Sequence, residues 1–438
     1  MATISRHRPQ NPVRLIHPDW CKNAVMYQIN TRQFTKQGTF SAAIEHLPRL
    51  KDLGIDIIYL MPINPIGLKN RKGSLGSPYA VQNYLTINPE FGTIDDFKAL
   101  VNAIHAQGMY VIVDWVANHS AWDNVLVAEQ PQWYSRDHQN DFHPTPWWDW
   151  HDIIDFDYSH PELREYMAKA MCYWVKECDI DGYRCDVAGM VPTDFWVAVR
   201  QQLEQIKPVL MLAEWETRDL HYAAFDMTYA WMWNETLHGI CMGKLKIEKL
   251  FKYYSWHEKT YPKDAIKMTF VSNHDKNAWD GTQFEQFGEG LKAAIVLSVL
   301  GDGMPLIYNG QEAGNPKRLA FFDRDPIEWR NHEIGDLYQQ LITIKKSHSA
   351  LANGQWGATM LHVANSSPDS VFSFVRQDAY SQVLVVLNLS AKVQNVCLHS
   401  ALVTGSYREC LRQELQNFDS ITEFELASWD YRVWVKPL

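Results

Sequence analysis

Four carboxyl side chains follow or close apolar runs of the chain, and their spacing suits a shared site. They are Asp114, Asp186, Glu214 and Asp275. A buried ionised carboxylate costs free energy unless it is paired or used in chemistry. Arg184 stands two residues before Asp186, on the same face of a strand, and we expect its charge to keep Asp186 ionised and oriented at neutral pH. Glu214 has no such cation beside it in the sequence. The pattern predicts a catalytic site that uses carboxyl groups as nucleophile and acid or base.

The elements that must position these groups are predicted from an alternation of strand-length apolar runs with helix-length amphipathic segments. The predicted strands are residues 24–29, 55–60, 109–114, 180–186, 209–213, 225–229, 266–272 and 304–308. Residues 93–107 are typical of the helices, because Thr93 suits an N-cap and Gly108 a C-terminal stop. Strands joined through helices run parallel. Eight of them predict an α/β fold, a (β/α)8 TIM barrel whose site lies at the C-terminal ends of the strands.

Two regions interrupt the alternation and define the expected domains. Residues 119–158 form a long loop rich in tryptophan, histidine and aspartate, which predicts a short loop domain after the third strand. From residue 351 to 438, short β-rich runs at 371–376, 382–389 and 431–435 predict a C-terminal β-sandwich domain. We therefore expect an N-terminal arm over residues 1–22 and a catalytic barrel over residues 23–350.

Composition and charge exclude several classes of protein. Apolar residues make up 46% and charged residues 21% of the 438 residues, as in a globular protein. The net charge of −10, with no cluster of basic residues, argues against nucleic acid as a partner. No apolar run is long enough for a membrane span, and no signal-peptide core follows the polar N-terminus. Seven scattered cysteines without a CxxC pair suit reduced thiols, so we expect a cytoplasmic protein.

The segments around the four carboxyl groups resemble, in order, the four signature regions of the α-amylase family of glycoside hydrolases. They read DWVANH, GYRCDV, AEWE and FVSNHD. Four further segments agree with the same family: YQINTRQF, GIDIIYLMPI, DIIDFDYSHPELR and GMPLIYNGQEAG. The resemblance covers nearly the whole chain, including a C-terminal β domain. It implies the barrel fold and a hydrolase that acts on oligosaccharides.

The resemblance also implies roles for individual residues. Asp186 would attack the anomeric carbon, Glu214 would act as general acid and base, and Asp275 would hold substrate hydroxyls. A retaining mechanism places two such carboxyl groups about 5 to 5.5 Å apart. His119 and His274 would bind the sugar at the point of cleavage. Three further residues complete the expected set: Tyr79, stacking under the sugar ring, and Asp114 and Asn118, bracing the site.

Alternative interpretations of these residues stay open at this level. The carboxyl groups could be an ion-pair cluster at strand ends, the two histidines could be structural, and Tyr79 could be rim packing. Glu216 could rival Glu214 as the acid, because alternation along a strand points both side chains the same way. The tryptophans of residues 119–158 could stack on sugars or pack the loop onto the barrel.

One departure from the family pattern concerns a metal. Many family members hold a structural calcium through the Asn of the first region, carboxylates of the long loop and a His shortly after the nucleophile. Here Asn118 is present, but Gly189 and Met190 stand where Lys and His are common. Neither offers the oxygen ligands that calcium prefers. We therefore expect no metal ligands in the site and no cofactor, and the sequence leaves open whether a structural calcium is bound. The same change alters the leaving-group side of the site.

The expected function is retaining hydrolysis of α-glucosidic bonds in maltodextrin-like oligosaccharides through a covalent glycosyl-enzyme intermediate. The alternative is a 4-α-glucanotransferase or another transglycosylase, which shares the catalytic groups. A non-catalytic carbohydrate-binding protein is the rival from another class, and a sugar phosphorylase lacks a recognisable phosphate cradle. The sequence leaves open the substrate length, the linkage, endo or exo action and the oligomeric state.

Overall fold

The computed structural model describes residues 13–419 and 422–438; of the expected N-terminal arm, residues 1–12 lie outside the described part. Eight parallel strands close into a barrel in the order β1-β10-β9-β8-β7-β6-β3-β2. They are β1 (Met26–Ile29), β2 (Ile57–Leu60), β3 (Tyr110–Trp115), β6 (Gly182–Cys185), β7 (Leu210–Ala213), β8 (Met227–Tyr229), β9 (Ile266–Phe270) and β10 (Met304–Tyr308). The predicted (β/α)8 barrel is confirmed.

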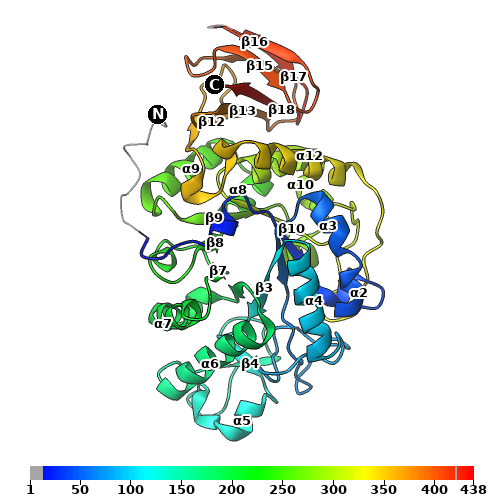
Figure 1. The fold of residues 1–438 in the computed structure, drawn as a ribbon, viewed down its shortest axis with the longest axis vertical. Helices are drawn as coiled ribbons and strands as arrows, with labels where there is room; N and C mark the ends of the chain where they lie inside the picture. Colours follow the sequence, from blue (N-terminus) through cyan, green and yellow to red (C-terminus); the bar gives the residue numbers. More distant parts are fainter. Residues whose placement is uncertain (1–12, 420–421) are drawn as a thin grey trace.

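Helices connect and surround the strands (Figure 1). They are α1 (Thr31–Phe34), α2 (Phe40–Ile44), α3 (Leu47–Leu53), α4 (Ile94–Ala106), α5 (Val125–Glu129), α6 (Pro161–Cys178), α7 (Thr193–Glu204), α8 (Trp231–Cys241), α9 (Glu248–Thr260), α10 (Gln283–Phe287), α11 (Leu291–Leu300) and α12 (Glu333–Ser347). Thr93 caps α4 as predicted, because its side chain accepts from the Asp96 backbone while the Asp96 carboxylate accepts from the Thr93 backbone.

Apolar side chains fill two layers of the barrel. The inner layer packs inside the strands and includes Met26, Tyr59 and Phe270, whereas the outer layer packs between strands and helices. In α11 nine of ten residues are buried, so this helix is apolar on all sides. The barrel interior is therefore packed, and polar groups are exposed for chemistry only at the strand ends.

The segment after β3 leaves the barrel and returns before α6. It contains α5 and a two-stranded antiparallel sheet formed by β4 (His119–Ala121) and β5 (Ile153–Asp155). His119 pairs with Asp155 in this sheet, so the base of the excursion begins directly beside the barrel mouth. Figure 1 shows it at the end of the molecule opposite the C-terminal strands.

Beyond α12 the chain becomes antiparallel β structure. The strands are β11 (Met360–His362), β12 (Val371–Gln377), β13 (Ser381–Asn388), β14 (Gln394–Leu398), β15 (Gly405–Glu409), β16 (Leu415–Phe418), β17 (Thr422–Leu426) and β18 (Tyr431–Pro437). Six form one sheet, and β14 with β17 forms a second sheet that shares an apolar core with the first. Phe372 packs on Phe251 and Tyr254 of α9, which joins this sandwich to the barrel.

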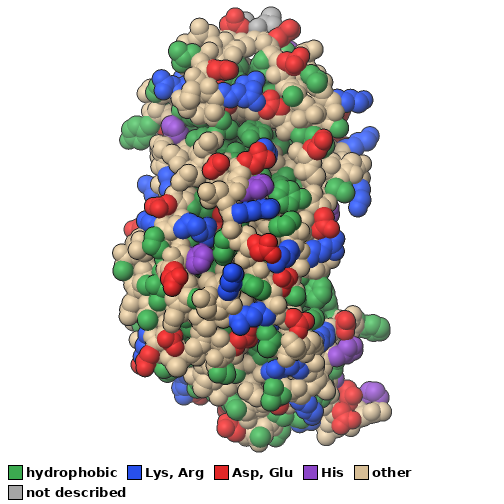
Figure 2. Space-filling model, turned by 90° about the vertical axis from the view of Figure 1, so that its right-hand side faces the viewer, with side chains coloured by type: hydrophobic (Ala, Val, Ile, Leu, Met, Phe, Trp, Pro, Cys, Tyr) green, Lys and Arg blue, Asp and Glu red, His purple; other side chains and the backbone are tan. Residues whose placement is uncertain are grey.

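The charge is mixed on one face of the molecule (Figure 2). On the face in Figure 2, acidic and basic side chains are interspersed rather than gathered into a broad patch of one sign. Among the helices of residues 13–419 and 422–438, none is long and apolar enough to cross a membrane.

Candidate active site

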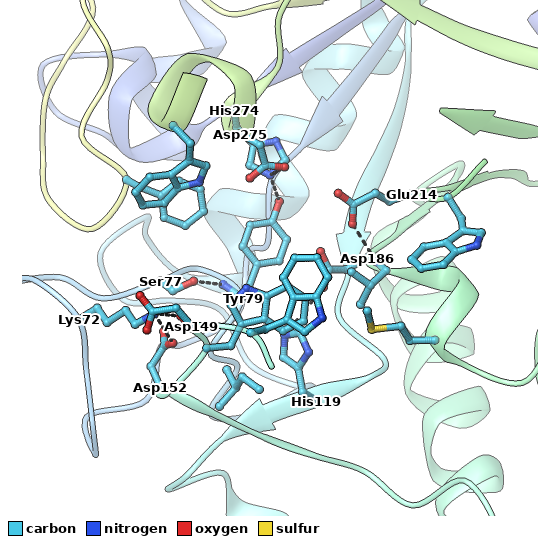
Figure 3. A pocket seen from close by; sticks show the side chains of 18 of the residues that line it. Lys72, Ser77, Tyr79, His119, Asp149, Asp152, Asp186, Glu214, His274 and Asp275 are labelled. Carbon is cyan, nitrogen blue, oxygen red and sulfur yellow. Dashed lines mark hydrogen bonds and ion pairs between the residues drawn. The ribbon is translucent and has the colours of Figure 1, made fainter. Parts of the chain in front are cut away.

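A cavity of about 910 Å³ opens at the C-terminal ends of the barrel strands (Figure 3). Six of the residues predicted from the sequence line it: Tyr79, His119, Asp186, Glu214, His274 and Asp275. The other three, Asp114, Asn118 and Arg184, do not line the cavity and stand behind its wall, in contact with residues that do. The predicted residues therefore meet in one place, although they come from five different segments.

Arg184 holds the carboxyl groups together from inside β6. Its guanidinium is fully buried and donates through Nη1 to Asp114 at 2.7 Å and to Asp186 at 2.8 Å. Its Nη2 lies 2.9 Å from Oε1 of Glu214, as an ion pair without hydrogen-bond geometry. The strands β6 and β7 are neighbours, with Cys185 opposite Ala213, so Asp186 and Glu214 follow one another around the rim. The cation that Glu214 lacks in sequence is thus supplied by the neighbouring strand.

Burial, more than Arg184, decides how these carboxyl groups ionise. Desolvation raises the pKa of Asp186 to about 7, although Arg184 opposes this rise. The pKa of Glu214 is raised well above its usual range, again first by burial and then by Asp186 and Asp275. The expectation that Arg184 simply keeps Asp186 ionised needs correction, because one guanidinium faces three carboxyl groups. The group therefore retains a proton near neutral pH, and Glu214 is the better holder of it.

The backbone after Asp186 is strained in a way that serves Glu214. Val187 has a φ of 35°, in the left-handed region that β-branched residues rarely adopt. In this conformation its backbone N–H donates to Oε2 of Glu214 at 2.8 Å. Val187, the residue after Asp186, thus fixes the Glu214 carboxyl group on the cavity side.

A chain of hydrogen bonds fixes His274 and Tyr79. The His274 backbone N–H donates to Oε1 of Gln28, so the Gln28 amide nitrogen faces Nδ1 of His274, at 2.8 Å. Nε2 of His274 then carries the proton and points to the Tyr79 hydroxyl at 2.7 Å, and that hydroxyl donates to Asp114 at 2.8 Å. The Tyr79 hydroxyl is engaged by both partners, and Tyr79 lines the cavity.

His119 and His274 are both neutral near pH 7. Burial lowers the pKa of His119 to about 4 and that of His274 to about 3. Nε2 of His119 lies 3.8 Å from Asp186, and the amide of Asn118 contacts its Nδ1 at 3.2 Å. Nε2 of His274 lies 3.3 Å from Asp275, whose pKa burial raises to about 6. The neutral imidazole of His119 can donate to a sugar hydroxyl without adding charge beside the carboxyl groups, whereas the N–H of His274 is already used by Tyr79.

Glu216 does not compete with Glu214 as the acid. The strand β7 ends at Ala213, so strand alternation no longer governs where Glu216 points. Its carboxylate accepts from the Met232 backbone at 2.7 Å, at the first turn of α8, and pairs with Lys267 at 3.3 Å. Glu216 therefore holds α8 and the cavity wall in place.

Sequence reasoning missed most of the apolar lining. Of the five loop tryptophans, Trp148 and Trp150 reach the cavity and stack on each other at 4.8 Å between ring centroids, whereas the cavity does not include Trp122, Trp133 or Trp147. Other lining residues come from loops and from the first turns of helices after the strands: Lys72, Met190, Trp215, Trp231, Met232, Trp279, Phe321 and Phe322. Clusters of aromatic residues outside predicted strands were the available signal.

The residues around Asn118 do not fit a calcium site. The Asn118 amide faces Asp155 at 3.3 Å, and Thr145 also donates to that carboxyl group, whose pKa is raised by burial. A side chain at Gly189 would collide with the ring of Trp215, so no ligand can approach from that position. Within the part of the chain that the structure describes, no three His, Cys, Asp or Glu side chains gather as a metal site.

Comparison with known proteins agrees with this geometry. Residues 16–350 match the model of the α-amylase catalytic domain. A maltogenic α-amylase from Thermotoga neapolitana shares 32% identity over 95% of this chain and 99% of its own, with a TM-score of 0.86. An α-amylase from Lactobacillus plantarum shares 32% identity over 94% and 99%, with a TM-score of 0.84.

A longer relative is similar over most of this chain as well. The α-amylase MalA of Haloarcula japonica is 26% identical over 430 residues, which cover 93% of this chain but 61% of MalA, so this chain spans less than two thirds of that relative. The family model covers more than half of the chain, and two solved structures of similar length share the whole fold. The chain therefore belongs to the α-amylase family of glycoside hydrolases, whose members hydrolyse α-glucosidic bonds with retention of configuration.

Proposed function

We propose that this protein hydrolyses α-glucosidic bonds of short maltodextrins, with Asp186 as nucleophile, Glu214 as general acid and base, and Asp275 holding substrate hydroxyls. The observation that carries this proposal is the single buried guanidinium of Arg184 serving three carboxyl groups. It leaves one carboxyl group ionised and another protonated at the same pH, which a retaining mechanism requires.

In the first step Asp186 attacks the anomeric carbon and forms a bond to it. Glu214 gives its proton to the glycosidic oxygen as the bond to the leaving sugar breaks, so the leaving group departs as a neutral alcohol. The Glu214 carboxylate that results is stabilised by Arg184 and by the Val187 N–H. Because Asp186 is no longer ionised, Arg184 interacts more strongly with the Glu214 carboxylate.

In the second step Glu214 removes a proton from a water molecule, whose oxygen attacks the same carbon. The bond to Asp186 breaks, and both carboxyl groups return to their starting states. Asp275 and the neutral His119 orient the hydroxyl groups of the sugar in both steps, while His274 holds Tyr79 in place. Tyr79 offers its ring below the sugar, because its hydroxyl is already bonded to Asp114 and His274.

The substrate class is supported by the names of the relatives and by the lining of the cavity. Similar proteins are named maltogenic α-amylase, cyclomaltodextrinase and neopullulanase, all enzymes of α-glucans by name. The cavity combines hydrogen-bonding groups with several aromatic rings, which suits the polar edges and apolar faces of glucose residues.

The first experiment measures reducing sugar released from maltose, maltotriose, maltoheptaose, isomaltose, sucrose and soluble starch. We expect release from the maltodextrins, with the α-anomer appearing first when the products are followed by NMR. Oligomers longer than maltotriose, formed from maltotriose itself, would favour the transglycosylase alternative.

Two variants frame this experiment. Asp186→Asn removes the nucleophile and should abolish release, whereas Asp219→Asn changes an exposed carboxylate outside the cavity and should leave it intact. A β-anomer as first product, or equal activity in Asp186→Asn, would contradict the mechanism. No release from any substrate would favour the carbohydrate-binding alternative.

We further propose a cytoplasmic location. All seven cysteines of the chain are unpaired in the structure, as is usual in a reducing compartment. A relative named intracellular maltogenic amylase, from Bacillus subtilis, is 24% identical over 92% of this chain. Fractionation of the source cells with antibody detection would test the location, and protein in the medium would contradict it.

A further inference from the structure

The two ends of the cavity are opposite one another across the barrel. Glu214 follows β7, and the strand facing β7 in the closed order is β1, which has β10 and β2 on its two sides. The segments after β2 and β10 supply Lys72 and Phe322, so these side chains stand across the mouth from the general acid. Figure 3 shows Lys72, Asp149 and Asp152 grouped on one side of the cavity and Glu214 on the other.

This placement assigns the two ends to the two parts of a substrate. The acid must reach the glycosidic oxygen, so the leaving sugar extends past Glu214, toward Trp215 and Met190. The sugar that becomes bonded to Asp186 lies over Tyr79, and any further residues on its non-reducing side must run toward Lys72. The question is whether that side is open.

Three separate segments are tied together at that side. Leu75, in the segment after β2, donates its backbone N–H to the Phe322 carbonyl at 3.0 Å, and Ser74 donates its N–H to Asp323 at 2.9 Å. These bonds join the segment after β2 to the segment after β10. Phe322 at this junction lines the cavity, so the joined segments form part of its wall.

Lys72 extends this wall to the third segment, the excursion after β3. Its ammonium group donates to the carbonyl oxygen of Asp149 and lies 3.5 Å from Asp152 and 5.8 Å from the centre of the Phe322 ring. Lys72 is 26% exposed and Asp152 only 6%, and both line the cavity. A charged pair of this kind is positioned to exchange hydrogen bonds with adjacent sugar hydroxyls, because the ammonium donates and the carboxylate accepts.

We propose that Lys72 and Asp152 close the non-reducing side of the cavity and bind the hydroxyl groups of the terminal glucose residue, so that the enzyme acts from chain ends. This inference rests on the proposed function, since it assumes that Asp186 and Glu214 cleave between the two ends of the cavity. It makes Lys72 a determinant of substrate length, separate from the catalytic groups.

The test compares maltoheptaose with a maltoheptaoside whose terminal O4 and O6 are blocked by an ethylidene group. The block removes the two hydroxyls and adds apolar bulk where the wall stands. Wild-type protein should cleave the blocked substrate at least about tenfold more slowly, the scale of losing a hydrogen bond to a charged group. In Lys72→Ala this ratio should fall toward one and the range of product lengths should broaden.

Controls separate this inference from the function on which it rests. Lys69→Ala changes a nearby exposed lysine that contacts Trp122 outside the cavity, and it should keep the wild-type ratio. Lys72→Met keeps most of the side-chain volume and serves if Lys72→Ala loses thermal stability. Equal cleavage of both substrates by the wild type, or a ratio unchanged by both Lys72 variants, would overturn the closed end while leaving the hydrolase intact. Inactivity on the unblocked substrate would overturn both.

Discussion

Two buried arginines each bind carboxyl groups, but the pKa values of those groups shift in opposite directions. Arg184 at the C-terminal end of the barrel serves three carboxyl groups, those of Asp114, Asp186 and Glu214. Arg200 on α7, near the other end, binds Asp226 at 2.6 Å. Asp226 lies directly before β8 and is bonded by His17 as well, at 2.7 Å.

The two clusters differ in the number of carboxyl groups that share each cation. We relate this difference to the proposed catalytic role of the Arg184 cluster and the structural role of the Arg200 cluster. Burial alone would raise the pKa of Asp226, but Arg200 and His17 outweigh it and the pKa is lowered. At the other end burial prevails, and the pKa values of Asp186 and Glu214 are raised. A buried carboxylate bound by an arginine and a histidine stays ionised, whereas several carboxyl groups beside one arginine keep a mobile proton near neutral pH. Each prediction below changes one side of this comparison.

The largest expected effect follows Asp186→Asn. An amide cannot form the glycosyl-enzyme bond, so kcat on maltotriose should fall at least about 10⁴-fold. Steady-state kinetics with protein of verified fold by circular dichroism would measure this. A loss of kcat smaller than about 100-fold would mean that Asp186 is not the nucleophile and that Arg184 has a structural role.

Glu214→Gln should have the next largest effect, because it removes the mobile proton. The expected loss in kcat is about 10²- to 10⁴-fold on maltotriose and smaller on nitrophenyl maltosides, whose leaving group needs little protonation. Wild-type kcat/KM should rise with pH as Asp186, with a pKa of about 7, loses its proton, and should fall again when Glu214 ionises. Glu214→Gln should lose the alkaline fall. If kcat/KM of the variant still fell at alkaline pH, the fall would be due to another group.

Asp226→Asn should act on stability rather than on rate. It takes from Arg200 its buried carboxylate partner and leaves only the exposed carboxylate of Glu204, at 2.7 Å; breaking a buried pair in this way costs up to about 3–5 kcal/mol. Chemical denaturation would measure the loss, and kcat per folded molecule should stay within about twofold of the wild type. A loss of kcat approaching that of Glu214→Gln would erase the distinction between the two arginine clusters.

Sequence patterns predicted the barrel because period and capping are local properties. The segment at 225–229 shows their limit: the strand begins only at Met227, directly after Asp226, whose side chain binds Arg200, His17 and the Met211 backbone. Apolar character alone could not reveal that a buried ionic cluster stands directly before β8.

The site shows the same division between local and distant information. Strand-end motifs predicted residues that meet at one cavity, but the ionisation of Asp186 depends on burial and on a cross-strand ion pair between Arg184 and Glu214. The tautomer of His274 depends on Gln28, which is 246 residues away. The wall at Lys72 is likewise a product of three loops that meet only in the folded chain.

The smallest expected effect is a pH-dependent gain in stability from Asp186→Asn. In the unfolded chain Asp186 titrates near pH 4. In the folded chain its pKa is about 7, so between these values the folded state holds the extra proton and wild-type stability falls as pH rises. The variant lacks this titration, and its melting temperature should exceed that of the wild type by about 2 °C at pH 8 and by less at pH 4.5.

Asp226→Asn provides the opposite sign in the same experiment. The pKa of Asp226 is lowered by folding, so its contribution to stability is present above about pH 4 and is lost as pH falls through the folded value. The deficit of this variant should therefore be largest near neutral pH and should narrow in acid. Thermal melts of both variants from pH 3.5 to 8 would measure the two trends. Parallel trends would show that the arginine clusters do not differ in the balance of charge, and the separation of catalysis from structure argued from that balance would fail.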